Sequence, residues 1–253
     1  MRKITSSILN KIDEIESKEN VRIIYAVESG SRAWGFASSE SDYDVRFIYV
    51  HPLEHYLKLD SSRDIIEYQL DEVFDINGWD IQKTLRLAYS SNTNLLEWNH
   101  SPIVYKKVKE FDAIGNALDD YFSAKYCIYH YLNTAINNYR SYLTEETVRL
   151  KRYLYVIRPL LACRWILSKN CLPPIVFSEL FESQLEEDMK PIINSLVELK
   201  ISSPEVTKGK RIDRINEFID SNLVILKNQA DAMPREPKPS WDKLNELFLS
   251  IVR

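Results

Sequence analysis

The sequence predicts an α+β protein: an N-terminal mixed β-sheet with flanking helices, followed by an α-helical C-terminal domain. Apolar runs of strand length, rich in β-branched residues, occur in the first half of the chain. From about residue 112 onward, apolar residues instead recur at helical spacing over long stretches. The chain has 253 residues, of which 45% are hydrophobic and 28% charged, a composition typical of folded globular proteins. We therefore predict two domains, residues 1–110 and 111–253.

The N-terminal domain is predicted to begin with an amphipathic helix over residues 3–19. The segment VRIIYAV (21–27) follows as a strand, which ends at Ser29-Gly30-Ser31. Residues 32–36 are expected to begin a short helix. The segment DYDVRFIYV (42–50) predicts a second strand, ended by Pro52.

Two further strands are predicted over residues 63–70 and 72–76, and a helix over 80–89. The C-terminal domain is predicted to be helical because its apolar residues follow the helical period. The expected helices are 112–142, 145–168, 177–200, 210–229 and a last short one that begins near Trp241.

Composition excludes several classes of protein. With five glycines, the chain contains neither G-x-G-x-x-G nor G-x-x-x-x-G-K-[ST], which argues against Rossmann and P-loop nucleotide enzymes. The net charge of -4 argues against a nucleic-acid coat protein. The first twenty residues are too charged for the core of a signal peptide, and no stretch approaches the ~20 apolar residues of a membrane span. We therefore expect a cytoplasmic protein with no membrane partner.

Two aspartates open the second predicted strand. Asp42 and Asp44 are two residues apart, so their side chains project from one face of the strand. Adjacent carboxylates repel each other unless a cation lies between them, and oxygen ligands suit Mg²⁺. A third carboxylate on a neighbouring strand would complete a metal site for phosphoryl chemistry. Asp75, between two apolar residues, is the first candidate; Asp80 is the second, although its position favours a helix N-cap.

The turn before these aspartates can approach a phosphate. Gly30 lets the backbone come close to a ligand, and Ser31 and the amides after it can hold phosphates at the start of a helix. Taken singly, an Asp-x-Asp strand is more often solvated surface, and Gly-Ser is more often a plain turn. The order is more specific: a strand, Gly-Ser, about a dozen residues, an Asp-x-Asp strand and then an apolar-Asp-apolar strand.

Basic residues supply further candidates for binding a phosphate. Arg32 and Lys83 are expected near one edge of the sheet, with Lys83 equally compatible with a plain surface lysine. Lys151, Tyr155 and Arg158 would share one helix face, as a lid over a triphosphate or an RNA groove requires, although a solvated face is equally compatible. Arg46 lies on the strand face of the aspartates, and a structural role is favoured for it.

The chain resembles the DNA polymerase β-type nucleotidyltransferase superfamily, and it is closer to the branch of predicted nucleotidyltransferases associated with RNA repair. The resemblance rests on GSRAWGFASSESDYDVRFIYV, DINGWDIQKTLRLAYSSNTNLLEWNHSPIVY, KRYLYVIRPLLACRWI and PSWDKLNELF, and it spans nearly the whole chain. One departure is Asn94, where the branch commonly has proline.

The resemblance implies Gly30 and Ser31 at the nucleotide phosphates and Asp42, Asp44 and Asp75 on Mg²⁺. It also implies transfer of a nucleoside monophosphate from an NTP, with ATP as the expected donor, to a hydroxyl, releasing pyrophosphate. We expect the acceptor to be an RNA end, with tRNA among the candidates. The alternatives are nucleotidylation of a protein or small-molecule hydroxyl, and an idle RNA-binding scaffold. The sequence leaves base preference, the number of nucleotides added and oligomeric state open.

Overall fold

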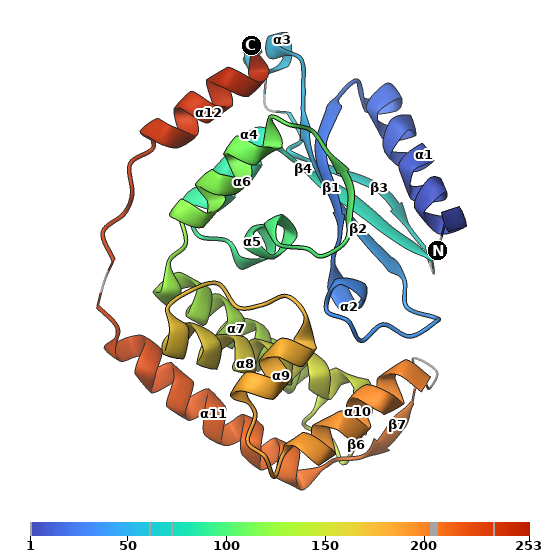
Figure 1. Ribbon diagram of the computed structural model, residues 1–253, viewed down its shortest axis with the longest axis vertical. Coiled ribbons are helices and arrows are strands. Elements are labelled where there is room, and N and C mark those ends of the chain that lie inside the picture. The colour runs from blue at the N-terminus through green and yellow to red at the C-terminus, as the bar shows by residue number, and fades with distance from the viewer. Residues whose placement is uncertain (1, 61, 72, 203–206, 235) are drawn as a thin grey trace. The chain divides into compact units, whose positions relative to one another are not determined.

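The chain folds into two units, each assembled from separate stretches of sequence, in the computed structural model (Figure 1). The structure describes residues 2–60, 62–71, 73–202, 207–234 and 236–253. The sheet unit comprises Met1–Ala33, Asp42–Tyr121 and Lys238–Arg253. The helical unit comprises Trp34–Ser41 and Phe122–Pro237. The segment between the Gly-Ser turn and the first aspartate therefore belongs to the helical unit.

The sheet unit is built around a five-stranded mixed sheet in the order β3-β4-β2-β1-β5. Strands β2 and β4 are parallel, and every other neighbouring pair is antiparallel. Its strands are β1 Arg22–Glu28, β2 Tyr43–Val50, β3 Ile65–Leu70, β4 Phe74–Asp80 and β5 Val104–Lys107. Its helices are α1 Arg2–Glu19, α2 Gly30–Ala33, α3 Leu53–Tyr56, α4 Ile81–Tyr89, α5 Thr93–Asn99, α6 Phe111–Asp120 and α12 Asp242–Val252.

Helix α1 covers one face of this sheet. Its isoleucines Ile8, Ile12 and Ile15 are fully buried against alternate residues of the strands, including Val45 and Phe47. Because side chains alternate between the faces of a strand, the residues in between project from the opposite face. The side chains of Asp44 and Arg46 in β2, and of Asp75 and Asn77 in β4, therefore project from the face opposite to α1.

The C-terminal helix α12 returns to the sheet unit. It packs against α4 and α6. The ring of Trp241, just before the helix, stacks on Tyr89 at 3.7 Å, and the Tyr121 hydroxyl donates to the Ser240 carbonyl at 2.6 Å. These contacts make residues 238–253 part of the N-terminal fold. The predicted domain boundary at residue 110 stays a prediction. It differs from the division into the sheet unit and the helical unit, which are both discontinuous in sequence.

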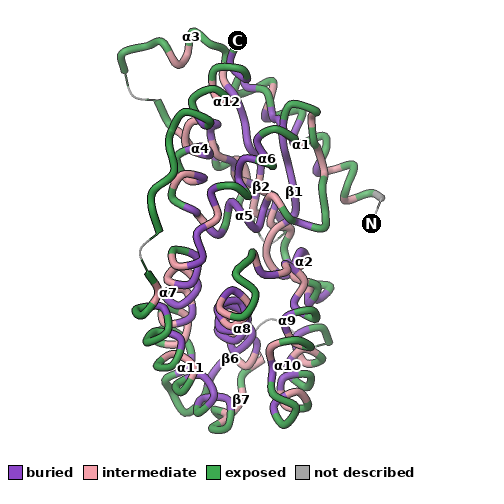
Figure 2. Tube along the Cα trace, turned by 60° about the vertical axis from the view of Figure 1, so that its left-hand side comes forward, coloured by how far each residue is buried: buried purple, intermediate pink, exposed green. Residues whose placement is uncertain are grey.

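Helix α8 is the central helix of the helical unit, and its residues are buried along most of its length (Figure 2). Its helices are α7 Ala124–Tyr142, α8 Leu154–Lys169, α9 Phe177–Gln184, α10 Lys190–Ser202 and α11 Asp213–Ala232, with a 3₁₀ turn over Leu150–Tyr153. A two-stranded antiparallel ribbon joins β6 Thr147–Arg149 to β7 Lys208–Lys210. The segment from residue 34 to 41 packs here: Phe36 lies against Phe177 and Tyr155, and Lys200 Nζ donates to Ser41 Oγ at 3.3 Å.

Three of the predicted long helices are shorter than expected. The helix predicted over 112–142 is two helices, because the side chain of Ser123 caps a new helix start. The region 145–168 begins with β6, since pairing with β7 overrides the local helical pattern. The region 177–200 is interrupted after Leu185, whose backbone is extended. The start of the strand predicted over 72–76 lies at Glu72, outside the described residues.

Candidate active site

The register of two parallel strands brings Asp44 and Asp75 together. Asp44 in β2 is the direct neighbour of Asp75 in β4. The flanking residues Val45, Phe74 and Ile76 face α1, so the two carboxylates project from the other face of the sheet. This places them where a ligand can reach them, at the end of the sheet where β2 and β4 begin.

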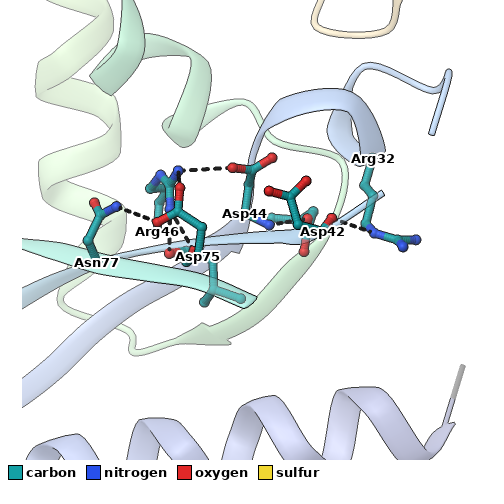
Figure 3. A network of polar contacts seen from close by, with 8 residues as sticks. Arg32, Asp42, Asp44, Arg46, Asp75 and Asn77 are labelled. Carbon is teal, nitrogen blue, oxygen red and sulfur yellow. Dashed lines mark hydrogen bonds and ion pairs between the residues drawn. The ribbon is translucent and has the colours of Figure 1, made fainter. Parts of the chain in front are cut away.

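Arg46 lies between these two carboxylates (Figure 3). Its Nη2 is 3.0 Å from Asp44 Oδ1 and 2.6 Å from Asp75 Oδ2, and its Nη1 donates to the Asp75 carbonyl at 2.7 Å. Asn77 Nδ2 donates to the second oxygen of Asp75 at 3.1 Å. Both aspartate side chains keep 20–26% of their surface exposed. The pair therefore binds one positive charge and stays accessible.

Gly30 lies directly under Asp44. Its φ is +60°, in the left-handed region, and a Cβ atom there would lie 2.0 Å from Asp44 Oδ2. The Ser29 amide donates to the Asp44 carbonyl at 2.8 Å, which holds the turn against β2. Only glycine combines this backbone conformation with so close an approach. The predicted Gly-Ser turn and Asp-x-Asp strand are thus in contact.

Burial raises the pKa of two carboxylates at this site, Asp44 and Glu28. Desolvation raises the pKa of Asp44 to about 6, the Arg46 guanidinium lowers it, and neighbouring Asp42 and Asp75 raise it further. Glu28, at the end of β1, is fully buried, and desolvation raises its pKa to about 7. Its Oε1 accepts from the Asp44 amide at 2.9 Å, and its Oε2 accepts from the Tyr105 hydroxyl. Glu28 therefore holds the backbone of Asp44.

Sequence reasoning missed Glu28 and Tyr105. The available signal for Glu28 was a carboxylate that ends an apolar strand immediately before the Gly-Ser turn. Tyr105 lies on β5, a strand that the sequence pattern did not predict. Its contact with Glu28 depends on the pairing of β5 with β1.

Asp42, Ser31 and Arg32 lie at the same end of the sheet. Asp42 is exposed and immediately precedes β2, beside Asp44 in Figure 3. The Arg32 Nε donates to the Asp42 carbonyl at 2.9 Å, and its guanidinium lies 3.7 Å from the centre of the Tyr43 ring. Ser31 is buried in the short helix α2. The structure thus gathers the three predicted carboxylates, the Gly-Ser turn and Arg32.

Lys83 lies at the opposite end of the sheet, against the expectation that it would share an edge with Arg32. Strand β4 continues through Asp80, and Lys83 follows in α4, where its Nζ pairs with Asp64 Oδ2 at 3.1 Å. Asp80 is the N-cap of α4, because its side chain accepts from the Gln82 amide at 2.7 Å. The structure therefore places Asp75, and not Asp80, beside Asp44 and Asp42.

The remaining candidates belong to the helical unit. Lys151 lies in the 3₁₀ turn before α8, so it does not share a helix with Arg158 as expected, and both side chains are buried. The Arg158 guanidinium lies 4.4 Å from the centre of the Trp34 ring, and Tyr155 packs edge-on against the same ring. Burial removes the solvent-facing basic stripe. A role in nucleotide binding for these three stays a prediction.

The carboxylates of Asp42, Asp44 and Asp75 offer oxygen donors, the ligand type that hard divalent cations bind. Among the residues that the structure describes, no three or more His, Cys, Asp or Glu side chains meet as a metal cage. Asp44 and Asp75 nonetheless offer oxygen ligands that face one shared cation, the Arg46 guanidinium, and Asp42 adds an accessible carboxylate. Oxygen ligands of this kind suit Mg²⁺.

Three comparisons relate the chain to known proteins. The family model described as "RNA repair pathway DNA polymerase beta family" matches residues 4–250. The chain is 40% identical over 247 residues to the uncharacterized protein YcgL of Bacillus subtilis (strain 168), covering 97% of this chain and 95% of the relative. A nucleotidyltransferase-like protein from Exiguobacterium sibiricum 255-15 is 12% identical, with 98% of this chain and 79% of that chain covered and a TM-score of 0.33.

No helix within the described ranges is long and apolar enough to cross a membrane.

The family match spans both units and includes the three clustered aspartates, Asp42, Asp44 and Asp75. The chain therefore belongs to the RNA repair pathway DNA polymerase beta family and is a nucleotidyltransferase.

Proposed function

We propose that this protein transfers a nucleoside monophosphate from ATP or another NTP to the hydroxyl of an RNA end, in a Mg²⁺-dependent reaction that releases pyrophosphate. The observation that carries the proposal is the pairing of Asp44 with Asp75 in register on β2 and β4, directly above Gly30. Family membership supports the nucleotidyl chemistry and its connection with RNA repair. Mg²⁺, the choice of ATP and the RNA acceptor are parts of the proposal.

Asp42, Asp44 and Asp75 would hold the metal. When bound, Mg²⁺ would supply charge stabilisation at the phosphoryl oxygens and activate the attacking hydroxyl. Arg46 now holds Asp44 and Asp75, so metal binding requires its guanidinium to release at least one of them. The freed guanidinium would then be available to bind a phosphate oxygen, because arginine matches phosphate geometry.

The residues around the metal ligands orient them. The missing side chain at Gly30 leaves room for the Asp44 carboxylate, and the triphosphate is proposed to lie beside it, at the Gly30-Ser31 turn. Arg32, anchored on the Tyr43 ring and the Asp42 carbonyl, adds positive charge at this edge. Glu28 and Tyr105 fix the Asp44 backbone from the other face.

The test is transfer of label from α-³²P-NTPs to a panel of acceptors. Each of the four NTPs is incubated with Mg²⁺ and with RNA ends, including shortened tRNA, then separately with protein extract and with small alcohols. Label in RNA with stoichiometric pyrophosphate supports the proposal. Label in protein or in a small alcohol would identify another acceptor, and RNA binding without any transfer would identify an idle scaffold.

The matched variants are Asp44→Asn in the site and Asp112→Asn outside it. Asp112 is an exposed carboxylate that pairs with Lys107, so its variant controls for the loss of one charge. We expect transfer to be abolished in Asp44→Asn and unchanged in Asp112→Asn. Full activity of a folded Asp42→Asn/Asp44→Asn double variant would contradict the assignment.

A further inference from the structure

The β6–β7 ribbon of the helical unit has one strongly basic face. Residues that pair directly across an antiparallel ribbon, and those two apart along a strand, point to the same side. Arg149 pairs with Lys208, and Thr147 pairs with Lys210. These four exposed residues therefore form one surface, which we call the cationic face, with three positive charges on six strand residues.

The charges on the cationic face repel one another. Arg149 and Lys208 are directly opposite, where like charges destabilise a pair of strands. In the part of the chain that the structure describes, Arg149, Lys208 and Lys210 form no ion pair. By contrast, Arg214, Lys227 and Lys190 of the same unit each pair with a carboxylate. A bound anion would remove the repulsion on the ribbon.

The surroundings extend this surface. The guanidinium of Arg152 lies 4.3 Å from the centre of the Tyr142 ring, and that tyrosine is 42% exposed. Arg140 is exposed in the last turn of α7. Among the described residues, the carboxylates closest to the ribbon in sequence are Glu145 and Glu146, before β6, and Asp213, which pairs with Arg211. Arg152, three residues after β6, thus lies against an exposed aromatic ring.

The other face of the ribbon is anchored. Val148 is buried, and a Cβ atom on Gly209 would lie 2.9 Å from Leu150 Cδ1, so the backbone packs directly on the leucine. The Arg211 amide donates to the Glu146 carbonyl at 2.9 Å, and the Leu150 amide donates to the Thr207 carbonyl at 3.3 Å. The cationic face is therefore presented on fixed backbone and not on a loose loop.

We propose that the cationic face binds the sugar-phosphate backbone of the RNA acceptor. Lysine and arginine point charges on an exposed surface bind phosphates without reading the bases, and Tyr142 offers a ring on which a base can stack. The inference rests on the RNA acceptor of the proposed function but assigns a surface outside the carboxylate site. The ribbon cations are exposed, whereas Lys151 and Arg158 of the basic stripe predicted from the sequence are buried.

The test measures binding of fluorescently labelled single-stranded RNA to the full-length protein, without NTP, at 50–200 mM salt. The ribbon variant is Arg149→Gln/Lys208→Gln/Lys210→Gln. Each lost phosphate contact lowers the slope of log K against log salt by about 0.7 for single strands, so three contacts lower it by about 2. The wild-type Kd should therefore rise roughly 20-fold more than that of the ribbon variant over this range.

Two control variants separate charge from position. Arg149→Lys/Lys208→Arg/Lys210→Arg keeps the charges and should bind RNA like the wild type. Arg214→Gln/Lys227→Gln/Lys190→Gln removes three charges that already have carboxylate partners, and it should leave the salt slope unchanged. The melting temperature of the ribbon variant should be equal to or above that of the wild type, since its change removes repulsion.

The outcomes distinguish this inference from the proposed function. A ribbon variant that binds RNA with the wild-type affinity and salt slope would overturn the inference. If such a variant also extends RNA normally, the proposed function stands without the ribbon. If the wild type neither binds nor extends any RNA, the proposed function fails and the inference fails with it.

Discussion

Asp75 and Asp80 lie on the same strand, five residues apart, and their surroundings are opposite in kind. Asp75 is partly exposed, and its carboxylate is held by two side chains, Arg46 and Asn77. Asp80 is 4% exposed, and its carboxylate accepts from the Gln82 amide and, at 2.8 Å, from the Tyr56 hydroxyl. Burial raises the pKa of Asp80.

The difference shows how a carboxylate becomes available to a ligand. Arg46 and Asn77 hold Asp75 through rotatable side chains, so these partners can move without unwinding a helix. A backbone amide in the first turn of a helix cannot turn away, so moving Asp80 uncaps α4. Two aspartates on one strand thus differ in their surroundings: Asp75 is held by movable side chains, and Asp80 caps a helix.

The largest expected effect is on catalysis at Asp75. We expect Asp75→Asn to reduce turnover by roughly 10²–10³-fold or more, because a neutral amide cannot replace the charge that faces the cation. Its thermal stability should change little. Steady-state NTP transfer and a melting curve measure the two quantities, and near-normal turnover would remove Asp75 from the site.

Gly30→Ala should reduce both stability and activity. The positive φ and the overlap with Asp44 together are expected to cost about 1–3 kcal/mol in the free energy of unfolding. The control is Gly35→Ala: Gly35 also has a positive φ, +85°, but a Cβ there would only touch Val176 at 3.4 Å. Denaturant unfolding should give a larger loss for Gly30→Ala, and equal losses would mean that the contact with Asp44 is unimportant.

Asp80→Ala should show the reverse of Asp75→Asn. Loss of the N-cap is expected to reduce the free energy of unfolding by about 1–2 kcal/mol, while turnover per folded molecule stays unchanged. Tyr56→Phe, which removes one hydrogen bond to Asp80, should cost about 0.5–1.5 kcal/mol. Urea unfolding measures both. A large fall in turnover per folded molecule for Asp80→Ala would restore it as a catalytic carboxylate.

The smallest effect is a pH dependence at the Asp80 end of the sheet. Burial and the neighbouring His55 lower the pKa of His51 from 6.5 to about 4. A lowered pKa of a base means that the folded state resists protonation, so stability is present above pH 6.5 and declines as the pH falls toward 4. Asp80, whose pKa is raised, acts in the opposite direction. His51→Gln should flatten the acid side of the stability curve, and an unchanged pH profile would contradict this reasoning.

Local sequence predicted the features that depend on local chemistry. Strands β1 and β2, the Gly-Ser turn, the cap at Asp80 and the helix after it follow from short patterns, and the structure contains all of them. The family resemblance is confirmed by the match over residues 4–250. The individual roles of Asp42, Asp44 and Asp75 stay predictions.

Features that depend on long-range pairing were not predictable. Asn77-Gly78 is a strong local turn signal, yet both residues continue β4 because they pair with Arg46 and Phe47 of β2. That continuation carries Lys83 to the far end of the sheet. The position of Arg46 between two carboxylates likewise depends on the β2–β4 register, and the ribbon depends on pairing across some sixty residues of sequence.

The sheet unit is discontinuous, and this affects how the chain is made. Residues 34–41 leave it to pack among the helices, and residues 238–253 complete it after the whole helical unit has been synthesised. A ribosome therefore releases β1, β2 and β4 long before α12 can cover α4 and α6. Until then the surfaces of α4 and α6 that α12 covers stay exposed, and no single cut in the chain yields either unit intact.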